Sequence, residues 1–304
     1  MDIRVTYNIP YIIPCGLNIA IYFYITGLHM GFYTTSVVAT LIGKKEWKPI
    51  GKIGAVGAVI ILIIAPIFLL IDLTKIPRFW HLFLYLNITS PITWGTFFLT
   101  SYPIIGLFYA WYVFQGKEKI SKILGLLGFP IAVSVHGYTG FILALGKGRA
   151  LWNASINPIL FLVSAMVSGL AIIIIIANIR RYYFATGITA IDRENDARIV
   201  NILIKMLIIF ILIDLVLLGS DLAVLANSTQ DGYYMFQLLT RGKFAFWFLG
   251  VEIFIGELIP LLILSIPKIG KTFLGQNIAS ICILIGIFVM RVIIVIGGQS
   301  VPLH

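Results

Sequence analysis

Eight apolar stretches, each about twenty or more residues long, follow one another along this chain of 304 residues. An α-helix of about 20 residues spans the ~30 Å hydrocarbon core of a bilayer. A helix also satisfies its own backbone hydrogen bonds, which lipid cannot do for it. We therefore predict an all-α, polytopic integral membrane protein whose single transmembrane domain packs as two four-helix bundles. The predicted spans are 12–42, 53–73, 91–114, 120–145, 156–179, 199–226, 244–266 and 272–296.

The charges of the chain also indicate a membrane protein. Charged residues make up only 11% of the sequence, whereas about 25% is usual for soluble proteins. The net charge of +10 comes from residues in the loops that flank the spans, where basic side chains contact anionic lipid headgroups. We therefore expect membrane lipid, and no nucleic acid, as the partner of these charges.

The distribution of basic residues predicts the orientation of the chain. Thirteen Lys and Arg residues lie in the first, third, fifth and seventh loops, against seven in the N-terminal segment and the other loops. The positive-inside rule then places the odd-numbered loops in the cytoplasm. We expect a multi-pass protein of the cell (cytoplasmic) membrane, with both termini outside.

Cysteine and histidine positions argue against metal cofactors in this chain. Cys15 and Cys282 are the only cysteines, and an iron–sulfur cluster needs about four ligands. A bis-histidine haem needs two histidines at similar depth. The two histidines inside spans, His29 and His136, differ in depth by roughly a dozen ångströms at 1.5 Å rise per residue. We therefore expect neither haem nor an iron–sulfur cluster.

Polar residues within the first span form a stripe. Asn18, Tyr22 and His29 fall within roughly 40° of one another on a regular helix. Such a stripe faces the other helices of a bundle rather than lipid. Hydrogen bonding between helices and binding of a ligand explain it equally well.

The fourth span carries a second polar pair, His136 and Tyr138, within the sequence PIAVSVHGYTGFILA. Two residues apart, they point about 200° from each other on a regular helix. Both face one pocket only if Gly137 or Pro130 distorts the backbone. A structural role and a ligand-binding role again fit the sequence equally.

Four carboxylic acids lie within the sixth and seventh spans. Asp214 and Asp221 are seven residues apart and share a face of the sixth span, whereas Glu252 and Glu257 point about 140° apart on a regular helix. Ionisable groups inside a span are costly and are candidates for function. A path for proton transfer, or ion pairing with a base such as Arg291, would give the same pattern.

Between the second and third spans, residues 76–88 are apolar and rich in aromatic side chains. Aromatic residues prefer the membrane–water interface, so we predict a short interfacial helix that covers the outer end of the bundle. Asp72, Arg78 and His81 flank or belong to this segment. We expect them to be structural or docking residues at the outer rim.

Several motifs resemble the NrfD/polysulfide-reductase membrane-subunit family. The stretch from Asp72 to Trp94, with DL, PRFWH and SPITWG, resembles its signature. NIAIYFYITGLHMGFY in the first span, HGYTGFILA with LWN and NPILFLVSA across the fourth and fifth, and the closing MRVIIVIGGQ fit the same family. These motifs cover most of the chain in the right order, although His29 and Met30 replace the usual small residues after GL.

The resemblance implies a haem-free, quinone-reactive membrane anchor of a respiratory oxidoreductase complex. Such a subunit exchanges electrons with a docked ferredoxin-like iron–sulfur subunit, which serves a molybdenum- or tungsten-pterin catalytic subunit. The quinone, menaquinone or similar, is expected to bind polar residues of the first and fourth spans. By position these are Asn18, Tyr22, His136 and Tyr138; Gly298 and Gln299 are placed by the resemblance alone.

Two other functions fit the residues. A proton-coupled membrane transporter would use the same buried carboxylates, and a purely structural anchor would hold partners without touching quinone. The aromatic segment and the GGQ sequence at the end of the chain favour the redox anchor over the transporter. The terminal substrate stays open, because polysulfide or sulfur, tetrathionate, nitrite, arsenate, dimethyl sulfoxide and hydrogen would all be handled by other proteins of the complex.

Overall fold

The computed structural model describes residues 15–72, 76–146, 148–183 and 190–301, and in this part of the chain every regular element is a helix. Eight helices in it are long and apolar enough to cross a membrane. The predicted fold class, an all-α polytopic membrane protein, is thereby confirmed. The spans are formed by α1 (Leu17–Ile42), α2 (Lys48–Asp72), α4 (Pro91–Gln115), α5 (Glu118–Ala144), α6 (Asn157–Tyr183), α7 (Ala190–Ala226), η3 (Phe246–Leu258) with α9 (Ile259–Ser265), and α11 (Phe273–Val292) with η4 (Ile293–Gly297).

Span boundaries differ from the prediction by a few residues. The predicted start of the first span at residue 12 lies outside the described residues, and α1 begins at Leu17. The second span begins at Lys48 instead of residue 53, because a lysine can extend its ammonium from the helix end toward the headgroups. Gly43 and Gly116 end α1 and α4 with φ values of 68° and 71°, a conformation that glycine adopts without steric cost.

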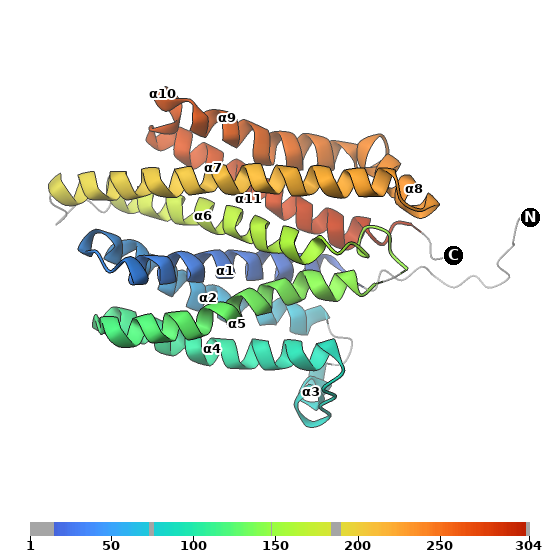
Figure 1. Ribbon diagram of the computed structural model, residues 1–304, viewed down its shortest axis with the longest axis horizontal. Coiled ribbons are helices and arrows are strands. Elements are labelled where there is room, and N and C mark those ends of the chain that lie inside the picture. Colours follow the sequence, from blue (N-terminus) through green and yellow to red (C-terminus); the bar gives the residue numbers. More distant parts are fainter. Residues whose placement is uncertain (1–14, 73–75, 147, 184–189, 302–304) are drawn as a thin grey trace, which may run out of the picture.

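The eight spans pack as two groups of four. One group contains α1, α2, α4 and α5, and the other contains α6, α7, η3 with α9, and α11. Helix α6 packs against α1 and α5, so α1 and α6 lie at the centre where the groups meet. Figure 1 shows the first group in blue to green and the second in yellow-green to red.

The close contact between α1 and α6 depends on glycine. Gly31 of α1 faces Gly169 of α6, and a Cβ atom on either would overlap the backbone of the other. One turn away, Gly27 faces Ala165. Small residues four apart on both helices are a common way for membrane helices to approach closely, since packing rather than the hydrophobic effect drives their association.

Replacing Gly31 by leucine is expected to destabilise the protein by about 3 kcal/mol or more, because the added side chain has no space between the two backbones. Gly219→Leu is the matched control, since a Cβ at Gly219 meets nothing within 4 Å. Thermal unfolding and size-exclusion chromatography of the detergent-extracted variants measure the difference. Equal melting temperatures of the two variants would contradict the proposed role of the glycine contact between α1 and α6.

The outward faces of the spans are apolar. Ile63 of α2, Trp111 of α4 and Val216 of α7 are each more than 60% exposed. Large exposed apolar surfaces of this extent do not persist in water. These faces are therefore the lipid-contacting surface of the protein.

Residues 76–88 form two short helical turns, η2 (Ile76–Arg78) and α3 (His81–Leu84). Their aromatic side chains are exposed, and Tyr85 is 77% accessible. The segment packs beside α4 and projects from the periphery of the molecule (Figure 1). It therefore does not cover the end of the bundle as the sequence suggested, and the apolar character of the segment alone could not distinguish these positions.

Candidate functional site

The first and last spans meet at one end of the bundle through Gln299. The Gln299 side chain accepts a hydrogen bond from the Cys15 amide at 3.2 Å and donates to the Cys15 carbonyl at 2.9 Å. Asp72, at the end of α2, lies close to Gly16 at the same end. Burial and the negative charge of Asp72 raise the pKa of the Cys15 thiol, while Arg149 opposes the shift. The start of α1 and the ends of α2 and η4 therefore share one end of the molecule.

The loop after α5 holds this end together. Arg149 is buried and donates hydrogen bonds to the carbonyls of Gln299 (3.1 Å) and Val301 (2.7 Å). Trp152 donates from Nε1 to the Ile294 carbonyl at 2.6 Å. A Cβ at Gly298 would overlap the Trp152 ring, which gives a physical reason for the glycine and for the LWN motif. Sequence reasoning missed these roles of Arg149 and Trp152.

Three of the four predicted quinone residues lie where α1 and α5 meet. Tyr22 and His136 are buried, and Tyr138 is half-buried. The Tyr22 and Tyr138 hydroxyls are close enough to interact electrostatically. His136 packs against Gly27, one turn and a half further along α1 from Tyr22, with 3.2 Å between its Cε1 and the position of a Gly27 Cβ. Asn18 is half-buried and lies one turn before Tyr22.

His136 and Tyr138 point toward different neighbours. His136 Nε2 lies 2.8 Å from the Phe161 carbonyl of α6, whereas the Tyr138 ring lies against Gly95 of α4. Helix α5 stays α-helical around Gly137, so the backbone distortion that would turn both side chains into one direction is absent there. The glycine of the SPITWG motif thus provides space for the Tyr138 ring, a role that the sequence did not reveal.

The hydrogen bond to Phe161 determines which nitrogen of His136 carries the proton. A carbonyl oxygen can only accept, so Nε2 is the donor and Nδ1 of the neutral ring is an acceptor. Nδ1 is buried and has no hydrogen-bond partner among the described residues. A buried acceptor without a partner is unusual, which makes Nδ1 a candidate for contact with a ligand.

The four predicted carboxylic acids gather inside the second group of helices. Asp214, Asp221, Glu252 and Glu257 are all buried, and Asp214 interacts electrostatically with both glutamates. Neither oxygen of Asp214 or of Glu257 has a hydrogen-bond partner among the described residues. The acids therefore form one cluster of charged or protonatable groups.

The relative direction of Glu252 and Glu257 differs from the sequence prediction. Both belong to η3, a π-helix of 13 residues, in which each amide bonds to the carbonyl five residues earlier. Residues five apart therefore lie on nearly the same face, instead of 140° apart. Periodicity assumed for an α-helix could not anticipate this, and π-helical turns occur frequently at functional sites.

Arg291 of α11 links the acids to His136. Its fully buried guanidinium donates to Ser164 Oγ at 2.6 Å and to the Phe161 carbonyl at 3.2 Å, and lies 3.8 Å above the Phe161 ring. It also interacts electrostatically with Asp214. The Phe161 carbonyl thus accepts hydrogen bonds from both His136 and Arg291.

A chain of buried aromatic and hydroxyl groups extends from His29 toward the opposite end of the first group. The His29 and Tyr102 rings lie 4.6 Å apart, and Tyr102 and Tyr33 lie 5.2 Å apart. Beyond them, the Tyr109 hydroxyl lies 2.9 Å from Ser36 Oγ. Sequence reasoning missed this chain, although Tyr22, His29 and Ser36 are spaced seven apart, as are Tyr102 and Tyr109.

The three rim residues have different surroundings in the structure. Asp72 belongs to the end where α1 begins. Arg78 is exposed, and His81 is held between Trp80 and Tyr85, with ring centres 4.1 and 5.7 Å away. In the part of the chain that the structure describes, no three His, Cys, Asp or Glu side chains are arranged to hold a metal ion.

Comparison with known proteins agrees with the motifs. The family described as "Polysulphide reductase, NrfD" matches residues 7–302. The chain is 28% identical to a selenate reductase subunit of Mesobacillus selenatarsenatis, over 94% of this chain and 74% of the relative. It is 29% identical to the Hdr-like menaquinol oxidoreductase integral membrane subunit of Archaeoglobus fulgidus, over 95% of this chain and 72% of the relative. A polysulfide reductase polypeptide of Wolinella succinogenes is 28% identical over 50% of this chain and 55% of its own length.

One of these relatives is named as an integral membrane subunit of an oxidoreductase and the other two as parts of reductases, which supports a membrane anchor role in respiratory electron transfer for this chain. The match extends over nearly every residue, from before α1 to beyond η4. The chain therefore belongs to the polysulphide reductase NrfD family.

Proposed function

We propose that this chain is the quinone-reactive membrane subunit of a respiratory oxidoreductase complex. It exchanges electrons between the membrane quinone pool and an iron–sulfur subunit docked on the membrane surface. The observation that carries the proposal is the buried imidazole of His136, which packs against α1 near its polar start and has one acceptor nitrogen without a partner among the described residues. Tyr22 and Tyr138, which interact with each other, lie where the same two helices meet. A relative named as a menaquinol oxidoreductase subunit supports a quinone of the menaquinone type.

The residues of this group suit a quinone. A bound quinone supplies two-electron, two-proton redox chemistry, and the protein supplies binding and proton exchange. Tyr138 is half-buried, and its hydroxyl can donate a hydrogen bond to a quinone carbonyl. His136 Nδ1 can accept a hydrogen bond from a quinol hydroxyl while Nε2–H stays bound to Phe161. Asn18 and Tyr22 add donors on the side of α1.

Charged and protonatable groups continue from His136 into the protein interior. His136 and Arg291 bond to the same Phe161 carbonyl, and Arg291 interacts with Asp214 and Glu252. We assign proton transfer to the cluster of Asp214, Asp221, Glu252 and Glu257, whose oxygens largely lack direct partners among the described residues. A cavity of about 20 Å³ beside Asp221 and Glu252 has room for about one bridging water, which could carry protons between acids.

The proposed partners dock at the end where α1 begins and η4 ends. Both termini face the outside of the cell membrane in this proposal, and the ferredoxin-like iron–sulfur subunit covers Asp72 and the neighbouring segment with Arg78 and His81. A molybdenum- or tungsten-pterin subunit completes the complex. Cross-links from the iron–sulfur subunit to Lys117 or Lys268 instead would place it at the opposite end.

Gentle detergent extraction from the native membrane, followed by mass spectrometry of the co-purifying proteins, tests the proposal. We expect a multi-cluster iron–sulfur protein, a large pterin-containing subunit and bound quinone. Recovery of the chain alone, with neither iron nor quinone, would instead favour a proton-coupled transporter. That alternative has its own support in the buried carboxyls of Asp214 and Glu257, which lack hydrogen-bond partners among the described residues.

A further inference from the structure

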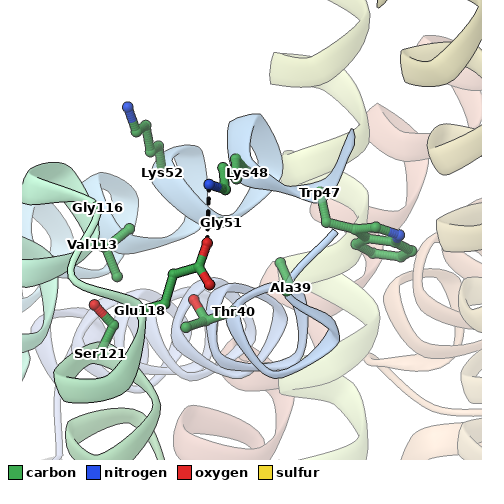
Figure 2. A pocket seen from close by; sticks show the side chains of 11 residues that line it. Ala39, Thr40, Trp47, Lys48, Gly51, Lys52, Val113, Gly116, Glu118 and Ser121 are labelled. Atoms are coloured by element: carbon green, nitrogen blue, oxygen red, sulfur yellow. Dashed lines mark ion pairs between the residues drawn. The ribbon is translucent and has the colours of Figure 1, made fainter. Parts of the chain in front are cut away.

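A cavity of about 190 Å³ opens at the other end of the first helix group, far along α1 from Tyr22. Its walls come from the end of α1, the start of α2, the end of α4 and the start of α5 (Figure 2). Because four spans begin or end here, the cavity lies at one surface of the membrane. Thr40, Trp47, Lys48, Lys52 and Ser121 are among its lining residues.

The opening of the cavity is positively charged. Lys48 and Lys52 are exposed at its rim, and the Lys122 ammonium lies 3.2 Å from the position of a Gly43 Cβ, also at the rim. Glu118 is the carboxylate in the lining, and it pairs with Lys48 at 3.0 Å (Figure 2). One negative charge thus faces three ammonium groups.

A second cavity of about 390 Å³ adjoins the first, and the two share Lys48 and Lys52. Lys45 and Arg180 extend the basic lining there. Arg180 is partly neutralised by Asp196 at 3.7 Å. Lys48 and Lys52 therefore line both cavities, which together we call the basic recess.

The interior and surroundings of the recess are apolar. Ala39, Val113 and the buried Trp47 line the first cavity. Phe114 and Ile123, on the outward faces of α4 and α5, are more than half exposed to lipid beside it. A basic opening at headgroup level next to an apolar, lipid-facing surface matches an amphiphile with an anionic head.

We propose that this recess binds the headgroup of an anionic phospholipid, with the phosphate between Lys48 and Lys52 and the acyl chains along α4 and α5. Multiple ammonium groups around one phosphate provide charge-assisted hydrogen bonds. A soluble anion would use the lysines but not the exposed apolar faces beside them. The proposal does not depend on the quinone site, which lies at the opposite end of α1.

The test compares variants of the purified, full-length protein by native mass spectrometry and by lipid extraction. In the double variant Lys48→Gln/Lys52→Gln, the affinity for the anionic phospholipid is expected to fall about 25-fold, which is about fivefold for each lysine. Lys268→Gln/Lys271→Gln removes the same charge from the same membrane surface and is expected to retain the lipid. Equal loss of bound lipid in both double variants would show that general surface charge, and not the recess, holds the lipid, and would overturn the proposal.

A second variant is expected to increase lipid binding, a change that loss of folding could not produce. Glu118→Gln removes the carboxylate that occupies Lys48, so lipid retention is expected to rise. Thermal stabilisation is then measured in nanodiscs of phosphatidylglycerol or phosphatidylcholine, and in detergent with inorganic phosphate. Stabilisation by phosphatidylglycerol alone supports the proposal, whereas equal stabilisation by inorganic phosphate would assign the recess to a soluble anion, and unchanged retention in Glu118→Gln would contradict it.

Discussion

Quinol-dependent turnover of the assembled complex is expected to fall about 100-fold when Tyr138 is replaced by phenylalanine, the size of effect typical of losing a proton-transfer group. The variant keeps the aromatic ring that packs against Gly95, so only the hydroxyl is lost. His136→Ala removes the acceptor Nδ1 and is expected to have an effect of the same order. Turnover is measured with a water-soluble quinol analogue and the native terminal acceptor.

Two controls make this result specific to the quinone reaction. Tyr182→Phe changes a tyrosine that is 51% exposed near the end of α6, away from the proposed docking end, and is expected to leave turnover unchanged. Reduction of the terminal acceptor by an artificial dye, which bypasses the membrane subunit, should be normal in Tyr138→Phe. If quinol-dependent turnover survives both Tyr138→Phe and His136→Ala, the site lies elsewhere and the assignment fails.

The second large effect is expected from Arg291. Replacing it by glutamine leaves Asp214 and Glu252 without the buried positive charge with which they interact, and breaking a buried charge pair on one side costs about 3–5 kcal/mol. It also removes the donors to Ser164 and Phe161. A large drop in the thermal unfolding temperature of the detergent-solubilised chain would report this loss.

A compensating variant separates lost charge balance from lost packing. Asp214→Asn in the Arg291→Gln background removes an uncompensated acid, so we expect part of the stability to return. Arg241→Gln, at an exposed arginine beyond α8 (Gln230–Thr240), is the matched control and should melt like the parent. A double variant no more stable than Arg291→Gln would show that the guanidinium acts through its hydrogen bonds alone.

The spans were predictable because length and apolarity suffice to identify a membrane helix. The eight predicted segments correspond to the eight observed spans, with shifts at the ends where lysines and glycines decide the boundary. The burial of the four acids and of Arg291 also followed from their positions inside spans. These properties depend on local sequence alone.

Contacts between helices were not predictable in the same way. Nothing in the sequence indicates that His136 and Arg291, 155 positions apart by their residue numbers, bond to one carbonyl of Phe161. The composition of the aromatic segment that contains Trp80 fits equally a segment that covers the end of the bundle and one that projects from its periphery. The resemblance placed the motifs in order along the chain. Only the structure shows why Gly95 and Gly298 are glycines, since a Cβ there would overlap Tyr138 and Trp152.

The π-helical turns of η3 have a consequence for comparing this chain with its relatives. A π-helical turn accommodates more residues than an α-helical turn over a similar rise. A relative that lacks one residue in the seventh span can therefore keep both ends of that helix in place by converting a wide turn to an α-turn. Alignment gaps within Phe246–Leu258 should accordingly be placed so that the buried carboxyl groups of the relatives superpose on Glu252 and Glu257, even where this interrupts an otherwise ungapped sequence alignment.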